Sequence, residues 1–167
     1  MTILPGSVMD DRTPADTRPG AEIAPPDESK RPRHSETILV ADDDPWVLSM
    51  TVDFLVGEGY QVLPEAGGEE ALRIAETHEG PIHLLLTDVV MPRVNGWVLA
   101  KRLRPVRPET KVLFMTAYSS ELVPDYQTVL GDPVIMKPFD LDKLKYKVRE
   151  LLGHSSPFAR RRACAKG

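Results

Sequence analysis

The sequence predicts an α/β fold, a doubly wound five-stranded parallel sheet with helices on both faces. Short apolar runs typical of buried strands alternate with segments whose apolar residues recur at helical spacing. Strands that alternate with helices are joined by right-handed crossovers, which cover both faces of a parallel sheet. A chain of 167 residues suits one domain with tails, and its 41% hydrophobic content is enough for a core.

The first expected strand is the apolar run "TILVA" at residues 37–41. Asp44 can cap a helix and Pro45 suits the first helical position, so a helix is expected to begin at Pro45. Apolar residues recur at roughly helical spacing after it. The segment "YQVLPEA", residues 60–66, then supplies a short second strand.

The middle of the chain continues the alternation. Residues 67–80, "GGEEALRIAETHEG", predict a helix that ends at Gly80. Residues 81–88, "PIHLLLTD", form a continuous apolar run and predict a buried third strand. The segment "NGWVLAKRLRP" at 95–105 predicts a third helix, stopped by Pro105.

The last third of the domain holds two strands and two helices. Residues 110–117, "TKVLFMTA", predict a fourth strand, and "PVIMKPF" at 133–139 predicts a short fifth one. The helix expected between them, at 119–133, is the weakest element because its apolar stripe is sparse. Residues 140–153 predict a final helix with one leucine-rich face. Five strands and five helices fit the flavodoxin-like strand order 2-1-3-4-5.

The two flanks differ from this domain in composition. Residues 1–36 are rich in proline and poor in apolar residues, which predicts a disordered extension, and residues 154–167 predict a basic flexible tail. The domain itself, residues 37–153, has 18 acidic and 12 basic residues, so nucleic-acid binding by its surface is not expected. The single cysteine, Cys164, excludes an intrachain disulfide. Without a signal peptide or an apolar run of spanning length, we expect a cytoplasmic protein with no membrane contact.

Five polar residues fall at or just after the carboxyl ends of the expected strands. They are Asp42, Asp43, Asp88, Thr116 and Lys137. Because ligands bind outside the carboxyl ends of strands in such sheets, these side chains should share one site. Adjacent carboxylates repel each other unless a cation compensates, and hard oxygen ligands suit Mg²⁺. Lysine and threonine can hold a phosphoryl group beside the metal.

At these residues the chain closely resembles the receiver domain of response regulators in bacterial two-component signalling. The motifs "ILVADDD", "LLLTDVVMPRVNG", "VLFMTA" and "MKPF" occur in the family's order, over about residues 37–152. The chain is similar in particular to receivers of hybrid histidine kinases. The resemblance implies phosphoryl transfer to this protein from a sensor histidine kinase or a histidine phosphotransfer protein. It implies signalling through contacts with a further protein, which the sequence does not identify.

The resemblance also implies a role for each site residue. Asp88 would be the phosphoacceptor, Thr116 would hydrogen-bond the phosphoryl group and Lys137 would pair with it. The implied Mg²⁺ ligands are Asp42, Asp43, Asp88 and the backbone carbonyl of Val90. Such a domain is not a conventional enzyme, although it catalyses its own phosphorylation. Since no output domain follows Gly153, a stand-alone receiver is expected.

Three further expectations follow from the resemblance. The Lys137–Pro138 bond should be cis, as is usual in the family. Val134 stands where the family has an aromatic residue that moves with the threonine, so the usual switch is altered. Val90 and Tyr118 flank the path of the hydrolytic water, and neither has a carboxylate or amide to orient it. Slow loss of the phosphoryl group is therefore expected.

Two other classes of function account for part of this pattern. A phosphohydrolase of the haloacid dehalogenase type would use Asp42 and Asp44 as an Asp-x-Asp motif, with Thr116 and Lys137 following in order, but it leaves Asp88 unexplained. A receiver fold that serves only as an interaction module would not need the complete acceptor set. The remaining candidates predict ordinary roles: four histidines show no ligand spacing, and both tryptophans suit helix packing. These are His34, His78, His83, His154, Trp46 and Trp97.

Overall fold

The computed structural model describes residues 34–117 and 131–154. Within these ranges the chain forms one parallel sheet of five strands in the order β2-β1-β3-β4-β5, as predicted. The strands are β1 (Thr37–Ala41), β2 (Gln61–Glu65), β3 (Leu84–Asp88), β4 (Lys111–Thr116) and β5 (Val134–Met136). The helices are α1 (Pro45–Gly57), α2 (Gly68–Thr77), α3 (Gly96–Val106) and α5 (Leu141–Leu151). None of these helices is both long and apolar enough to cross a membrane.

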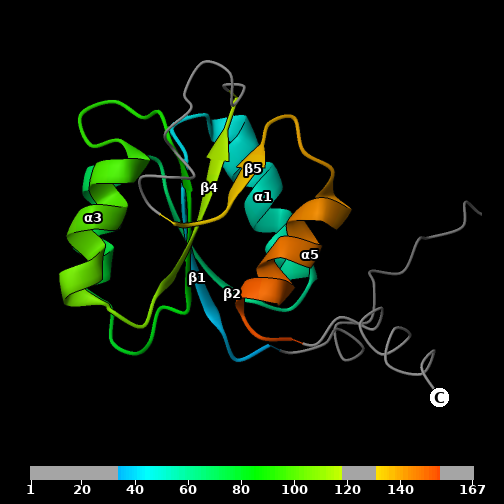
Figure 1. Cartoon of the computed structure of the whole chain (residues 1–167), viewed down its shortest axis with the longest axis horizontal. Coiled ribbons are helices and arrows are strands. Elements are labelled where there is room, and N and C mark those ends of the chain that lie inside the picture. Colours follow the sequence, from blue (N-terminus) through cyan, green and yellow to red (C-terminus); the bar gives the residue numbers. More distant parts are fainter. Residues whose placement is uncertain (1–33, 118–130, 155–167) are drawn as a thin grey trace, which may run out of the picture.

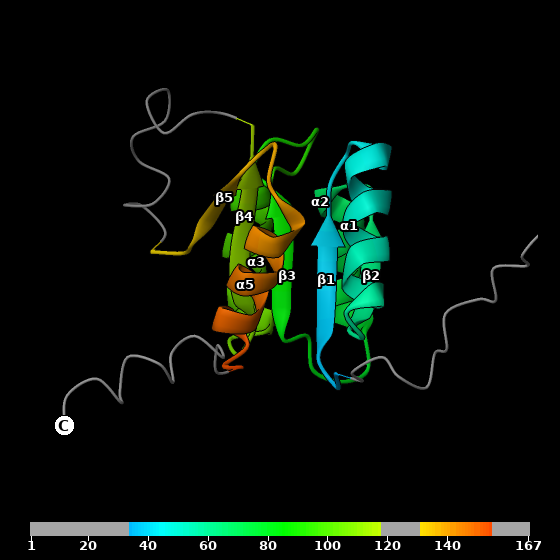
Figure 2. The same ribbon diagram turned by 90° about the vertical axis from the view of Figure 1, so that its right-hand side faces the viewer.

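The sheet separates two layers of helices (Figures 1 and 2). Alternate residues of the central strands point to opposite faces, so Leu39 and Leu85 join a core cluster with residues of α2 and α3. Ile38 and Leu84 join the second cluster, with residues of α1 and α5. Both faces are covered, which explains why β1 is buried along its whole length.

Local signals place most of the helix starts. Asp44 caps α1 by accepting hydrogen bonds from the backbone N–H groups of Trp46 and Val47, and Pro45 is the first helical residue. Asn95 caps α3 and Asp140 caps α5 in the same way. These caps fix where the chain leaves each strand end and turns into the following helix.

Two predicted helix ends differ from the structure. Helix α2 ends at Thr77 rather than at Gly80, since the backbone of His78 is already extended, and the Arg107 side chain donates to the carbonyl groups of Ala75, His78 and Gly80 around this turn. Pro105 lies inside α3, which continues to Val106. Proline's fixed φ is compatible with the last helical turn, where only one hydrogen bond is lost.

Two other expectations concern side chains and an unplaced element. Trp46 was expected to pack within its helix, but it is 74% exposed, so that prediction is wrong. Most of the helix expected at 119–133 cannot be compared with the structure, because residues 119–130 lie outside the described ranges. Tyr118 lies outside them as well.

Candidate functional site

The strand ends bring the predicted site residues to one edge of the sheet. Asp42 directly follows β1, Asp88 is the last residue of β3, Thr116 ends β4 and Lys137 directly follows β5. Because β1, β3, β4 and β5 are consecutive neighbours in the sheet, these four residues converge although the chain separates them. We call these four together with Asp43 the acidic pocket.

Lys137 is the centre of the acidic pocket. Its Nζ lies 2.6 Å from Asp42 Oδ2 and 2.6 Å from Asp88 Oδ2. The Asp42 side chain is fully buried, and those of Lys137 and Asp88 are largely buried. One ammonium therefore compensates two carboxylates that would otherwise repel each other in a poorly solvated site.

Backbone groups orient the same carboxylates from the other side. Asp42 Oδ1 accepts a hydrogen bond from the N–H of Asp44 at 3.0 Å, and Asp88 Oδ1 accepts one from the N–H of Val90 at 3.1 Å. Each aspartate thus directs one oxygen to its own loop and the other to Lys137. Asp44 contributes its carboxylate to the helix cap instead, which agrees with its predicted role and leaves it unavailable as the second half of an Asp-x-Asp motif.

Burial and the hydrogen bonds of Lys137 have opposing effects on the charged groups of the pocket. Desolvation raises the pKa of Asp42, although hydrogen bonds from Lys137 and from the backbone of Asp44 oppose the shift. Burial also disfavours the charged form of Lys137, but its hydrogen bonds to Asp42 and Asp88 outweigh that effect and raise its pKa. Lys137 is therefore a firmly protonated cation at neutral pH.

Asp42, Asp43 and Asp88 offer carboxylate oxygens that all lie within 4.8 Å of one another. Asp43 is exposed, so this side of the pocket is open to solvent. A set of oxygen ligands at modest number, next to an open face that admits water, fits the preference of Mg²⁺. The structure therefore accommodates the predicted metal, and the donor set does not resemble a zinc site.

Thr116 ends β4 and Val90 follows the last residue of β3 by two positions, whereas Val134 begins β5. Thr116 is buried at the end of β4, and its carbonyl accepts a hydrogen bond of 2.6 Å from the N–H of Lys137. Val90, two residues after Asp88, is 47% exposed. Val134 packs against the core cluster next to α2 and α3. The Lys137–Pro138 bond is cis, as predicted.

Gly96 is a supporting residue that sequence reasoning missed. A Cβ atom at this position would lie 2.0 Å from the backbone oxygen of Asp88, so only glycine allows α3 to approach the end of β3. The Gly96 N–H also donates to the carbonyl of Val89 at 3.1 Å. The available signal was the pair Asn95–Gly96 before an apolar helical pattern. Asn95 caps the helix, and the glycine after it indicated a close approach of the backbone.

His78 is the C-cap residue of α2, and the other three histidines divide into two groups. His83 has a structural role, because its Nδ1 accepts the N–H of Thr37 at 2.9 Å. His34 and His154 lie together with Glu36 instead, at the opposite end of the sheet. No sequence spacing could reveal this, because the two histidines sit near the two ends of the described chain.

Comparisons with known proteins agree with this geometry. The family described as "Response regulator receiver domain" matches residues 38–149. The chain is 34% identical over 116 residues to the response regulator receiver protein CpdR of Brucella abortus, a match that covers 69% of this chain and 95% of CpdR. It is 33% identical over 121 residues to the sensor kinase CckA of the same organism, which covers 71% of this chain.

Solved structures give the same picture. The receiver domain of hybrid histidine kinase CckA aligns with a TM-score of 0.59 and 36% identity, covering 70% of this chain and 98% of that domain. The response regulator TrrA of Thermotoga maritima, in complex with Mg²⁺-BeF, aligns with a TM-score of 0.60 and 33% identity, covering 70% of this chain and 98% of TrrA. The match spans 13% of the whole CckA kinase and 50% of the Escherichia coli regulator CpxR. What it shares with these longer proteins is one domain.

Proposed function

The chain belongs to the response regulator receiver family, and on that premise we propose that it accepts a phosphoryl group on Asp88. The donor would be a phosphohistidine on a histidine kinase or a histidine phosphotransfer protein. The observation that carries the proposal is Lys137, whose ammonium lies 2.6 Å from both Asp42 and Asp88. This contact joins the ends of β1, β3 and β5 into one site with a carboxylate nucleophile and a fixed cation.

The proposed transfer forms a bond between a carboxylate oxygen of Asp88 and phosphorus. The bond between phosphorus and the donor imidazole nitrogen breaks, and the imidazole leaves with its electron pair. Negative charge spreads over the phosphoryl oxygens in the transition state, so a positioned cation lowers the barrier. Lys137 supplies that charge from its present position, and the Thr116 hydroxyl is proposed to donate to a phosphoryl oxygen.

Asp42, Asp43 and Asp88 would hold Mg²⁺, with the backbone carbonyl of Val90 as a further ligand. When bound, the ion would neutralise charge on the phosphoryl oxygens. Support comes from the carboxylate oxygens within 4.8 Å of one another, and from TrrA, whose solved structure contains Mg²⁺-BeF. The ion is also expected to stabilise the native state, since it relieves repulsion among these carboxylates.

The output is proposed to be a protein–protein contact rather than a reaction on a small molecule. Residues 37–153 would form the receiver, with 1–36 and 154–167 flanking it. The phosphoryl group is proposed to be lost slowly, because Val90 has no polar group with which to orient a water molecule. An Asp-x-Asp phosphohydrolase is disfavoured by the family match and by the capping role of Asp44.

The test is phosphorylation of the purified chain by a small donor such as acetyl phosphate. Intact mass should show one added phosphoryl group in the presence of Mg²⁺ and none in EDTA. Asp88→Asn keeps the side-chain shape and should remove the labelling. Asp53→Asn, at an exposed position of α1, is the matched control and should label like the wild type.

The position of the label decides the assignment. Trapping the acyl phosphate by reduction and mapping the modified peptide should identify Asp88. Labelling that persists in Asp88→Asn would contradict the proposed acceptor. Labelling that does not depend on Mg²⁺ would contradict the proposed role of the metal. Turnover of a chromogenic phosphate ester, which a receiver should lack, would favour the phosphohydrolase.

A further inference from the structure

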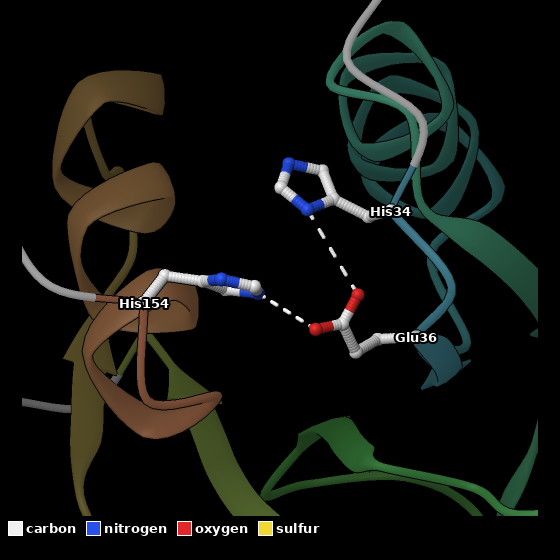
Figure 3. A group of neighbouring side chains, drawn as sticks. All are labelled: His34, Glu36 and His154. Carbon is white, nitrogen blue, oxygen red and sulfur yellow. Dashed lines mark ion pairs between the residues drawn. The ribbon is translucent and has the colours of Figure 1, made fainter.

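His34, Glu36 and His154 form a second polar cluster at the amino ends of the strands. We call it the histidine cluster. Figure 3 shows both imidazole rings next to the Glu36 carboxylate, His34 from the segment before β1 and His154 from the end of α5. All three side chains are largely buried, with 16%, 17% and 28% of their surface exposed in the order given.

Backbone hydrogen bonds hold the first two members. His34 N–H donates to the carbonyl of Gly59, and the Glu36 carbonyl accepts the N–H of Gln61, so this segment continues the pairing of β1 with β2. Side chains two residues apart in extended chain point to the same side, which places His34 and Glu36 together. The His34 ring also stacks on Tyr60, with ring centroids 4.4 Å apart and planes inclined by 13°.

A helix-ending turn delivers the third member. Gly153 has φ of +80°, its N–H donates to the carbonyl of Glu150, and the His154 N–H donates to the carbonyl of Arg149. This is the Schellman pattern, which requires a residue able to adopt positive φ. It reverses the chain after α5 and directs His154 back toward Glu36.

The atoms of the cluster are arranged as potential ligands. Glu36 Oε1 lies 2.8 Å from His154 Nε2, and Glu36 Oε2 lies 3.8 Å from His34 Nδ1. One nitrogen from each ring and the carboxylate oxygen all lie within 4.8 Å of one another. Ligands around a tetrahedral zinc ion are about 3.4 Å apart, given bonds of about 2.1 Å, so small side-chain rotations would suffice.

The His154 nitrogen also lacks a satisfactory partner of its own. Its Nε2 is shielded from solvent, and despite the 2.8 Å separation it makes no hydrogen bond of acceptable geometry with Glu36. The two atoms are close enough for a hydrogen bond, but the angle between them is unfavourable. A buried polar atom without a partner is costly, and a metal ion between the ligands would satisfy it.

We propose that His34, Glu36 and His154 bind Zn²⁺, with water completing the coordination. Two imidazoles and one carboxylate are a typical zinc donor set, and imidazole is a poor ligand for Mg²⁺. The ion would tie the segment before β1 to the end of α5. Glu36 and Asp42 flank β1, whose extended chain separates the two sites by roughly 20 Å. The proposed zinc site is therefore separate from the acidic pocket.

The test is a Zn²⁺ titration of the full chain against a chromogenic zinc indicator. The wild type should bind one ion, and His34→Ala and His154→Ala should each weaken binding at least about tenfold. His78→Ala is the matched histidine control, while Asp43→Asn and Cys164→Ser test other possible ligands. All three should bind like the wild type. Co²⁺ should give a visible absorption band that His154→Ala lacks.

Thermal unfolding separates a metal site from a plain ion pair. Zinc should raise the melting temperature of the wild type but not of His154→Ala, measured against EDTA. Glu36→Gln provides a second variant if an alanine variant fails to fold. The proposal is overturned if the wild type binds no zinc, if both histidine variants bind it normally, or if Asp43→Asn or Cys164→Ser abolishes binding.

Discussion

The acidic pocket and the histidine cluster lie at opposite ends of the same central strand, and they differ in every property that selects a ligand. The acidic pocket offers three carboxylates and no imidazole, with Lys137 as a counter-charge 2.6 Å from Asp42. The histidine cluster offers two imidazoles and one carboxylate. Carboxylates with an open face suit a hard ion that keeps its water, whereas imidazoles suit a transition metal.

The difference teaches how one fold can separate a reactive site from a structural one. The members of the acidic pocket lie at the carboxyl ends of four neighbouring strands, β1, β3, β4 and β5, so the sheet itself fixes its geometry. The histidine cluster depends instead on the segment before β1 and on the turn at Gly153 after α5, so it forms only when these two segments lie together. If the two sites are independent, a change in one should leave the other unaffected.

The largest effect should come from Asp88→Asn, which we expect to abolish phosphorylation while zinc binding remains normal. The reason is that Asp42 and Asp88 both contact Lys137, but the Asp42 side chain is fully buried whereas that of Asp88 is partly exposed to an incoming donor. His154→Ala should show the converse, with normal phosphorylation and weakened zinc binding. Mass spectrometry and zinc titration on both variants measure this. Loss of phosphorylation in His154→Ala would show that the two sites are coupled.

Lys137→Met should have the next largest effect, on stability. It leaves the fully buried Asp42 carboxylate without its cation, and breaking such a pair costs about 3 kcal/mol. Urea unfolding in EDTA should show this loss, and Mg²⁺ should restore part of it by replacing the missing charge. Lys147→Met removes an exposed pair with Glu150 and is the control, with an expected change below about 0.5 kcal/mol. Equal losses in the two variants would argue against a buried pair.

The acidic pocket was predictable from the positions of its members in the sequence. Each lies at the end of an apolar run, and parallel strands bring such ends together whatever the loops do. The strand order and the cis Lys137–Pro138 bond also agree with the structure. The predicted helix ends were less accurate. The turn after α2 is held by Arg107, which follows α3 and donates to the carbonyl of Ala75, and such a distant contact is not visible in the local sequence.

The histidine cluster could not be predicted for a physical reason. His34 and His154 meet only because a glycine turn reverses the chain after α5, and no local pattern relates them. Both residues, and Glu36, lie outside the range 37–153 that composition assigned to the domain. The exposure of Trp46 was missed likewise, because helical spacing alone does not say which face a capped first turn presents.

Gly96→Ala should be the third largest change, and it probes the support of the acidic pocket alone. Its new methyl group would meet the Asp88 backbone oxygen at 2.0 Å, so α3 or the end of β3 must shift, at a cost of about 2 kcal/mol. Gly57→Ala is the matched control, since no atom lies within 4 Å of the added carbon at that helical position. It should stabilise the protein by about 0.5 kcal/mol. Urea unfolding of both variants tests this contrast, and a neutral Gly96→Ala would refute the close approach.

Val90→Asn should have the smallest effect, a loss of the phosphoryl group about threefold faster, which corresponds to about 0.7 kcal/mol in the barrier. Val90 is 47% exposed and two residues from Asp88, so an amide there can orient a water molecule without disturbing the core. The rate is measured by timing the decay of the purified phosphoprotein. Val106→Asn, at a similarly exposed position that ends α3, is the control and should decay like the wild type. An unchanged rate in Val90→Asn would mean that this side chain does not limit the access of water. Zinc binding of the same variant should be unchanged if the two sites are independent.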